Sequence, residues 1–195
     1  MTATSPIPDP SHPAGSHLDR ALIEETAKKS GLLWVRGPQG PARGLWHVWY
    51  EGAVCLVGDG SLEQPLTGMG LADGATATVT VRGKDKGARL VVWPARVREL
   101  PAGGEEWQAA VEELKGKRLN APDADTMTDR WARESRVLRL EPAGEPLERP
   151  GAMPHGSQAA PPRATPATTR RDRPAGLPRL LFRRSRKRGT CSDAG

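Results

Sequence analysis

A chain of 195 residues has room for one ordinary domain and an extension, and its hydrophobic content of 36% is low for a chain packed throughout. Residues 1–142 hold 18 Lys and Arg against 19 Asp and Glu, whereas residues 143–195 hold 11 against 4, so the net charge of +6 resides in the C-terminal part. No apolar run reaches the roughly 18 residues of a membrane span, which argues against a transmembrane helix.

Both ends of the sequence are expected to be flexible. Residues 1–16 hold four prolines and no apolar run, which is unlike a signal peptide and indicates a flexible arm. Residues 143–195 hold eight of the 19 prolines and a single aromatic residue, Phe182. They bury too little apolar area to offset the entropy of ordering, so we expect a disordered tail after a folded domain at 17–142.

The two cysteines indicate a reducing setting. Cys55 lies in an apolar, strand-like run, where a thiol behaves as a small hydrophobic group, and Cys191 lies in the tail. They form neither a disulfide framework nor a metal-ligand spacing, and the histidines do not cluster. We therefore expect a cytoplasmic protein without a metal site.

The first part of the domain reads as a helix followed by strands. Residues 16–31 begin with a serine, place apolar residues on one face and end with two lysines before a glycine, which predicts a helix. GLLWVRG at 31–37 is a β-prone run, and GPQGPARG at 37–44 has the composition of a loop. LWHVWY at 45–50 and AVCLVG at 53–58 are separated by Glu51 and Gly52, which predicts a hairpin with a tight turn.

The second part continues the antiparallel pattern. Residues 58–74 form a long glycine-containing loop of a kind that is often functional. Strands are predicted at 75–85 and 88–100, with a turn near 86–87, and Pro94 suggests an edge strand or a bulge. A helix is predicted at 103–119, a helical turn at 126–133 and a final strand at 135–142. The order predicts a mainly β protein with flanking helices: about six antiparallel strands in a small barrel with helical lids.

Residues 17–142 resemble the pyridoxamine 5′-phosphate oxidase-like FMN-binding split-barrel family. The resemblance is carried by the pattern of elements, namely the leading helix, GLLWVRG, LWHVWYEGAVCLVGDGS, ATATVTVRGKD, LVVWPARVREL, EEWQAAVEELKGKRL and SRVLRLEP. It implies a split β-barrel, a homodimer with cofactor sites between subunits, and FMN as cofactor, with the deazaflavin F420 or no cofactor as alternatives.

The resemblance also implies a cofactor site. In the family a basic residue after the second hairpin strand holds the flavin phosphate, but the matching stretch here, GDGSLEQPL, offers Glu63 and Gln64 at that place. A carboxylate opposes a phosphate, whereas hydroxyl and backbone N–H groups favour it. The implied contacts are Trp46, His47 and Trp49 for the ring, Gly60, Ser61 and Gln64 for the phosphate, and Arg82 and Lys84 for additional charge.

The aromatic cluster at 45–50 has two explanations. In a single strand, Trp46, Val48 and Tyr50 would face one side, and Leu45, His47 and Trp49 the other, so both faces are apolar. One explanation is a strand covered by the barrel interior and by a helix or a second subunit. The other is a cleft in which a flavin ring stacks, and a partner subunit over the second face would satisfy both. His47 on its own is best explained as a structural histidine.

Two basic stretches remain. VRGKDKGAR at 81–89 reads as a solvated hairpin tip, as an anion site or as a nucleic-acid contact, although no aromatic residue lies among its cations. Residues 176–189 carry five cations in six positions beside an apolar patch, which suits an anionic surface of nucleic acid or lipid.

The functional hypothesis is a flavin- or deazaflavin-binding protein that can act as an oxidoreductase on a small molecule. The alternatives are a non-catalytic binding or structural barrel without the phosphate site, and a nucleic-acid or membrane-surface binder that works through the tail.

Overall fold

The computed structural model describes residues 17–83 and 88–154. The predicted arm at 1–16, the predicted turn near 86–87 and residues 155–195 lie outside the described residues. The chain divides into the units Met1–His155 and Gly156–Gly195, and every described residue belongs to the first.

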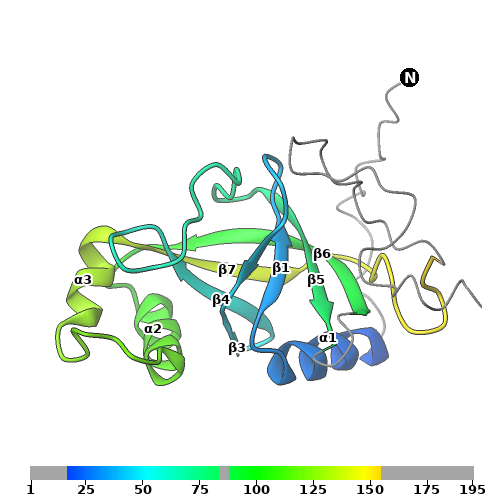
Figure 1. Ribbon diagram of the computed structural model, residues 1–195, viewed down its shortest axis with the longest axis horizontal. Coiled ribbons are helices and arrows are strands. Elements are labelled where there is room, and N and C mark those ends of the chain that lie inside the picture. The colour runs from blue at the N-terminus through cyan, green and yellow to red at the C-terminus, as the bar shows by residue number, and fades with distance from the viewer. Residues whose placement is uncertain (1–16, 84–87, 155–195) are drawn as a thin grey trace, which may run out of the picture. The chain divides into compact units, whose positions relative to one another are not determined.

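The fold is a curled antiparallel sheet with three helices among the described residues (Figure 1). Its elements are α1 (His17–Lys29), β1 (Leu33–Arg36), β2 (Arg43–Leu45), β3 (Val48–Tyr50), β4 (Ala53–Gly58), β5 (Thr76–Arg82), β6 (Arg89–Leu100), α2 (Glu105–Lys117), α3 (Met127–Glu134) and β7 (Arg136–Pro142). The strands are arranged in the order β2-β1-β5-β6-β7-β4-β3, and every neighbouring pair is antiparallel. The predicted mainly β split barrel with flanking helices is confirmed.

The predicted strand at 45–50 is corrected by the structure. The run is divided into the end of β2 and the whole of β3, and Trp46 and His47 lie between them. This division raises the number of strands from about six to the seven of the sheet. Because β2 and β3 are the two edges of the sheet, Trp46 and His47 span the split of the barrel.

The hairpin prediction is confirmed at the level of its turn. Tyr50 pairs with Ala53, and Glu51 and Gly52 between them have φ of 44° and 76°. Two successive positive φ angles are the geometry that joins twisted antiparallel strands with a two-residue turn. The four residues from Tyr50 to Ala53 therefore fix the register of β3 on β4.

Pro94 lies neither on an edge strand nor at a recorded bulge, contrary to the expectation. It pairs with Thr78 of β5 in the middle of the sheet, and the irregularity between β5 and β6 occurs at Val81 and Arg82. The N–H of Val92 points to the β7 side of β6, where it bonds the Glu148 carbonyl, so the missing N–H of Pro94 is on that side too. Strand β7 already ends there, opposite Ala95, so no ladder hydrogen bond is lost.

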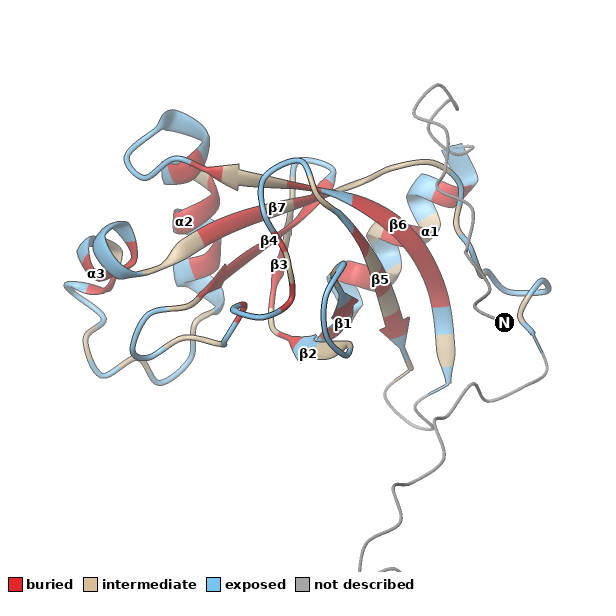
Figure 2. Cartoon of the chain, turned by 90° about the horizontal axis from the view of Figure 1, so that it is seen from above, coloured by how far each residue is buried: buried red, intermediate tan, exposed pale blue. Residues whose placement is uncertain are grey.

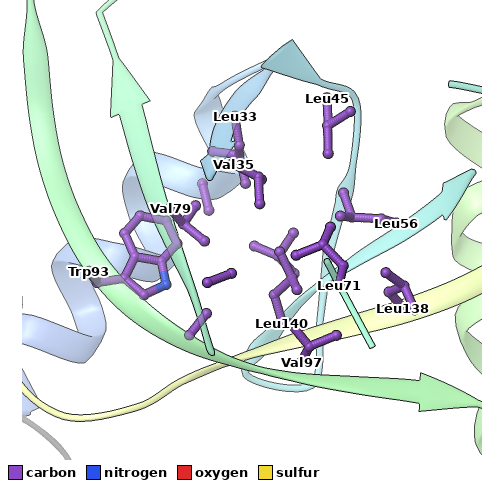
Figure 3. Packing of buried hydrophobic residues seen from close by; sticks show 14 of the residues in the cluster. Leu33, Val35, Leu45, Leu56, Leu71, Val79, Trp93, Val97, Leu138 and Leu140 are labelled. Atoms are coloured by element: carbon purple, nitrogen blue, oxygen red, sulfur yellow. The ribbon is translucent and has the colours of Figure 1, made fainter. Parts of the chain in front are cut away.

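Two hydrophobic cores lie on opposite faces of the sheet. The first fills the barrel, and Figure 3 shows side chains from β1, β4, β5, β6 and β7, among them Trp93 and Leu140, pointing toward one another inside it. The second joins α2 and α3 to the outer face of β4 and β7, with Trp107 and Trp131 as its largest members. All six residues of β4 are buried, since the strand contributes to both cores (Figure 2).

Residues 143–154 are described, and they contact the barrel although the sequence placed them in a disordered tail. The N–H of Val92 donates to the Glu148 carbonyl, and the N–H of Leu147 donates to the Val92 carbonyl. Glu148 also pairs with Arg89 at 2.8 Å, and Arg149 pairs with the buried Asp19 of α1 at 2.8 Å. We call residues 143–149 the strap, because they continue the sheet beyond the end of β7 and reach the first turn of α1.

Candidate functional site

A cleft of about 480 Å³ opens where the barrel is split. Its wall is formed by residues 46–49, and its sides are the C-terminal ends of α1 and α2, which both contact β3 (Figure 1). The lining residues are Ala27, Lys28, Ser30, Gly31, Trp46, His47, Val48, Trp49, Glu113, Lys117, Arg118 and Leu119. The volume lies in the range of about 300–1,000 Å³ that is usual for sites of small molecules.

All three predicted ring contacts, Trp46, His47 and Trp49, therefore meet in one cleft. Trp46 is half-buried and packs on the second core, whereas Trp49 is half-buried and packs on the barrel core. The two faces of the segment thus pack in part on the barrel interior and on helices of the same chain, and their remaining area lines the cleft. The aromatic cluster does not require a second subunit to cover it.

His47 is held in one orientation by the end of α1. Its Nε2 lies 3.0 Å from the carbonyl oxygen of Ala27, and because a carbonyl only accepts, Nε2 carries the proton. Nδ1 is buried and has no hydrogen-bond partner among the described residues. Burial lowers the pKa of His47; the bond to Ala27 opposes this, and the charge of Lys117 lowers the pKa further. The ring is therefore neutral at physiological pH.

The predicted phosphate contacts of Gln64 are already used within the protein. Its Oε1 accepts from the Trp46 N–H at 2.8 Å, and its Nε2 donates to the carbonyls of Trp46 at 2.9 Å and Val57 at 3.0 Å. A carboxamide has two donor hydrogens, and both are engaged. Gln64 thus forms the hydrogen bonds with the Trp46 N–H and carbonyl that a neighbouring strand would otherwise form, and it links Trp46 to β4.

Gly60 and Ser61 lie beside the end of α3 and not in the cleft. The Ser61 hydroxyl donates to Glu134 at 3.2 Å. A side chain at Gly60 would come within 2.7 Å of the Ser135 hydroxyl oxygen, so the backbone approaches this helix end closely. The remaining predicted contacts are also elsewhere: Arg82 lies at the end of β5 with its guanidinium 5.1 Å from the Trp34 ring, and Lys84 lies outside the described residues.

The residue that sequence reasoning misjudged is Glu63, whose side chain is fully buried. Its carboxylate pairs with Arg118 at 3.2 Å and Arg130 at 3.1 Å, and it accepts from the Trp131 indole N–H at 2.9 Å. Arg130 in turn pairs with Asp123 at 2.6 Å. This network attaches the loop at 58–74 to both α2 and α3, so the carboxylate that seemed to oppose a phosphate is neutralised from within.

Arg118 connects this network to the cleft. It follows α2, and its guanidinium lies 5.9 Å from the Trp46 ring while it donates to Glu63 and to the Leu62 carbonyl. A guanidinium near a ring face attracts the aromatic quadrupole. Residues 62–64 therefore fix Trp46 twice, through its backbone from Gln64 and through its ring from Arg118. No sequence signal pointed to this arrangement, because the partners are far apart in the chain.

The charge of the cleft is mainly positive. It holds Lys28, Lys117 and Arg118 against Glu113. Lys28 pairs with Glu24 and Arg118 pairs with Glu63, whereas no carboxylate within the described residues pairs with Lys117. The lysines also complement the C-terminal dipoles of their helices. A flat aromatic molecule with an anionic group would thus find two indoles, a fixed imidazole and an exposed ammonium.

Within the described residues, no helix has the length and apolar content needed to cross a membrane, and no group of three or more His, Cys, Asp and Glu side chains is arranged for a metal ion.

No protein-family model matches the sequence, and no curated protein matches it. Among solved structures, the chain is similar to HutZ, described as the heme storage protein from Vibrio cholerae, with a TM-score of 0.48 and 11% identity over 64% of this chain and 90% of that chain. It is also similar to the flavocytochrome Anf3 from Azotobacter vinelandii, with a TM-score of 0.39 and 17% identity over 85% of this chain and 90% of that chain. Likenesses at these scores establish no shared function, and the split barrel follows from the strand order itself.

Proposed function

We propose that the protein binds a flavin-type cofactor, FMN or F420, in the cleft at the split of the barrel, as a member of the pyridoxamine 5′-phosphate oxidase-like split barrels. The observation that supports this is the meeting of Trp46, His47 and Trp49, all selected from the sequence, in a single cleft of suitable volume. Two indoles provide the flat apolar walls that a tricyclic ring requires.

The phosphate contacts of the proposal differ from those expected from the sequence. Gln64 is saturated, and Gly60, Ser61 and Arg82 are absent from the lining of the cleft. Lys117 is the lining cation that pairs with no carboxylate of the described residues, so it is our candidate for the anionic group. When a flavin is bound, the ring supplies the redox chemistry, and the residues of the cleft orient it. The oxidoreductase activity, the homodimer and the cytoplasmic setting remain predictions.

A second candidate function is a non-catalytic binding or structural barrel. It is favoured by the loop at 60–64, in which Ser61, Glu63 and Gln64 all bond to other parts of the same chain. In this case the aromatic cleft would serve packing alone.

Equilibrium titration of the full chain with FMN, F420 and hemin distinguishes the two candidates. Flavin fluorescence and absorbance would report saturable micromolar binding of FMN or F420 if the proposal holds. Trp49→Leu and Lys117→Ala should each weaken that binding about tenfold, since each removes one contact with the cofactor. Trp34→Ala, which changes a tryptophan outside the cleft, is the matched control and should bind normally.

Absence of binding to both flavins, with circular dichroism showing a folded protein, would favour the non-catalytic barrel. Binding of hemin alone would keep the cleft as a cofactor site and reject the flavin.

A further inference from the structure

The outer face of the barrel at β1 and β5 is exposed, and no helix of the described residues packs extensively against either strand. Leu33 and Val35 of β1 and the odd-numbered residues of β5 point into the barrel core. Because side chains alternate along a strand, Trp34 and Arg36 of β1 and the even-numbered residues of β5 point outward. These outward positions are exposed or half-buried, in contrast to their neighbours.

The charged residues of β1 and β5 on this face are all arginines, and the strap carboxylate opposite Val92, Glu148, is paired with Arg89. The outward residues of β1, β5 and the first half of β6 are Trp34, Arg36, Thr76, Thr78, Thr80, Arg82, Leu90, Val92, Pro94 and Arg96, of which Val92 and Pro94 are buried. None of these outward residues is acidic. Arg36, Arg82 and Arg96 are exposed and form no ion pair within residues 17–83 and 88–154. Most other described arginines pair with carboxylates, namely Arg89, Arg98, Arg118, Arg130, Arg136, Arg139 and Arg149, whereas Arg20, Arg43 and Arg133 also form no ion pair among the described residues.

Trp34 lies flat on this face. It pairs with Gly44 of β2, and a Cβ at Gly44 would be 3.9 Å from two atoms of the indole, so the ring extends over the glycine. The Arg82 guanidinium lies 5.1 Å from the ring centroid. The side chain is 38% exposed, although tryptophan is usually well buried. The ring does not project for insertion, and a base that stacks on it would displace the Arg82 guanidinium, which is then available to a phosphate.

The strand register interleaves cations with the aromatic residue. Arg36 pairs with Thr78 and Trp34 pairs with Thr80, while Arg82 comes two residues later on β5. Arg36, Trp34 and Arg82 therefore occupy successive rows of the face, about 7 Å apart. From the sequence alone, the cations at 81–89 lack an aromatic residue among them. The sheet supplies one, Trp34, from β1, which is distant from these cations in the sequence but pairs with β5.

We propose that the outer face of β1 and β5 binds single-stranded nucleic acid, with Trp34 stacking on a base and Arg36, Arg82 and Arg96 contacting phosphates. Cationic grooves with aromatic platforms are the usual means of binding single strands without sequence preference. The threonine hydroxyls between the arginines add donors for phosphate oxygens. A second copy of the same face is disfavoured by like charge, and a lipid surface is disfavoured because Trp34 lies along the sheet. This site is separate from the flavin cleft.

The test is fluorescence anisotropy of a labelled oligothymidylate with the full chain at several salt concentrations. The wild type should bind, and log K should fall linearly with log salt. Arg36→Ala/Arg82→Ala should reduce the magnitude of that slope by about 1.4, since each phosphate contact to a single strand contributes about 0.7. Trp34→Ala should weaken binding about tenfold with little change of slope, and Trp34→Phe should restore most of it.

The matched control is Arg20→Ala/Arg133→Ala, which removes the same charge from two exposed arginines on α1 and α3. It should leave the slope close to that of the wild type. An equal loss in the control, or full binding by both variants of the face, would overturn the proposal and assign binding to the overall charge or to the basic stretch at 176–189. Equal affinity for a duplex, or stronger binding to phosphatidylserine vesicles that Trp34→Ala abolishes, would also overturn it. FMN binding by these variants separates a failure here from a failure of the cleft.

Discussion

At the scale of single residues, His47 shows how burial affects a titratable group. Its pKa is lowered, so the unfolded chain takes up a proton near the ordinary histidine value of about 6.5, whereas the folded protein does so only at lower pH. Between these two values the unfolded state binds the proton, so stability falls as the pH falls below about 6.5. Above that value His47 makes no such contribution.

His47→Gln should therefore lose less stability than the wild type when the pH is lowered from about 7.5 to about 5. Urea denaturation at both pH values measures this difference. His17→Gln, which changes an exposed histidine of α1, should retain the pH dependence of the wild type. Identical pH dependence in all three proteins would contradict the assignment.

Residue roles could be predicted where they follow from local pattern. Cys55 is buried, and burial raises the pKa of its thiol to about 11, as expected for a small hydrophobic group. Glu63 could not be predicted, because its partners Arg118 and Arg130 are 55 and 67 positions away. A buried carboxylate in a loop looks the same in sequence as an exposed one.

At the scale of elements, the hairpin at 48–58 could be predicted because its turn and both strands are contiguous. The break at Trp46 and His47 could not, because the hydrogen bonds that replace the strand come from Gln64, 18 positions later. The same holds for Pro94, whose missing donor is harmless only because β7 ends beside it.

Gln64→Ala should destabilise the protein by about 2 kcal/mol, because it leaves the N–H and carbonyl of Trp46 without their protein partners. The midpoint of urea denaturation measures the loss. Gln39→Ala, at an exposed position in another loop, should change stability by less than about 0.5 kcal/mol. A loss no larger than that of the control would show that water replaces the carboxamide without cost.

At the scale of the whole molecule, the domain boundary at residue 142 stays a prediction, and the strap gives a reason to test it. The low apolar content after residue 142 placed the boundary there, but the strap is held by backbone bonds to Val92 and by the pairs of Glu148 and Arg149. The amino-acid composition does not reveal such bonds, because backbone hydrogen bonds and two ion pairs can hold a segment that buries little apolar area.

A chain that ends at residue 142 should melt about 6 °C below a chain that ends at 154, since it loses about 2 kcal/mol and leaves Asp19 and Arg89 without these partners. A chain that ends at 154 should melt within about 1 °C of the full chain. Scanning calorimetry of the three chains measures both differences. Equal melting of the two shortened chains would support the boundary at 142.

Residues 62–64 have a consequence for anyone who wishes to redesign the cleft. Three consecutive residues hold this region together. Leu62 and Glu63 accept hydrogen bonds from Arg118, Glu63 also pairs with Arg130 of α3, and Gln64 bonds the backbone of Trp46 at the split of the barrel. A library that varies this loop to obtain a new ligand specificity would lose folded members faster than it gains new binders. Variation at Lys117 and Leu119, on the exposed rim of the cleft, changes ligand contacts without removing the bonds that hold the fold. These two positions are therefore the more productive starting point.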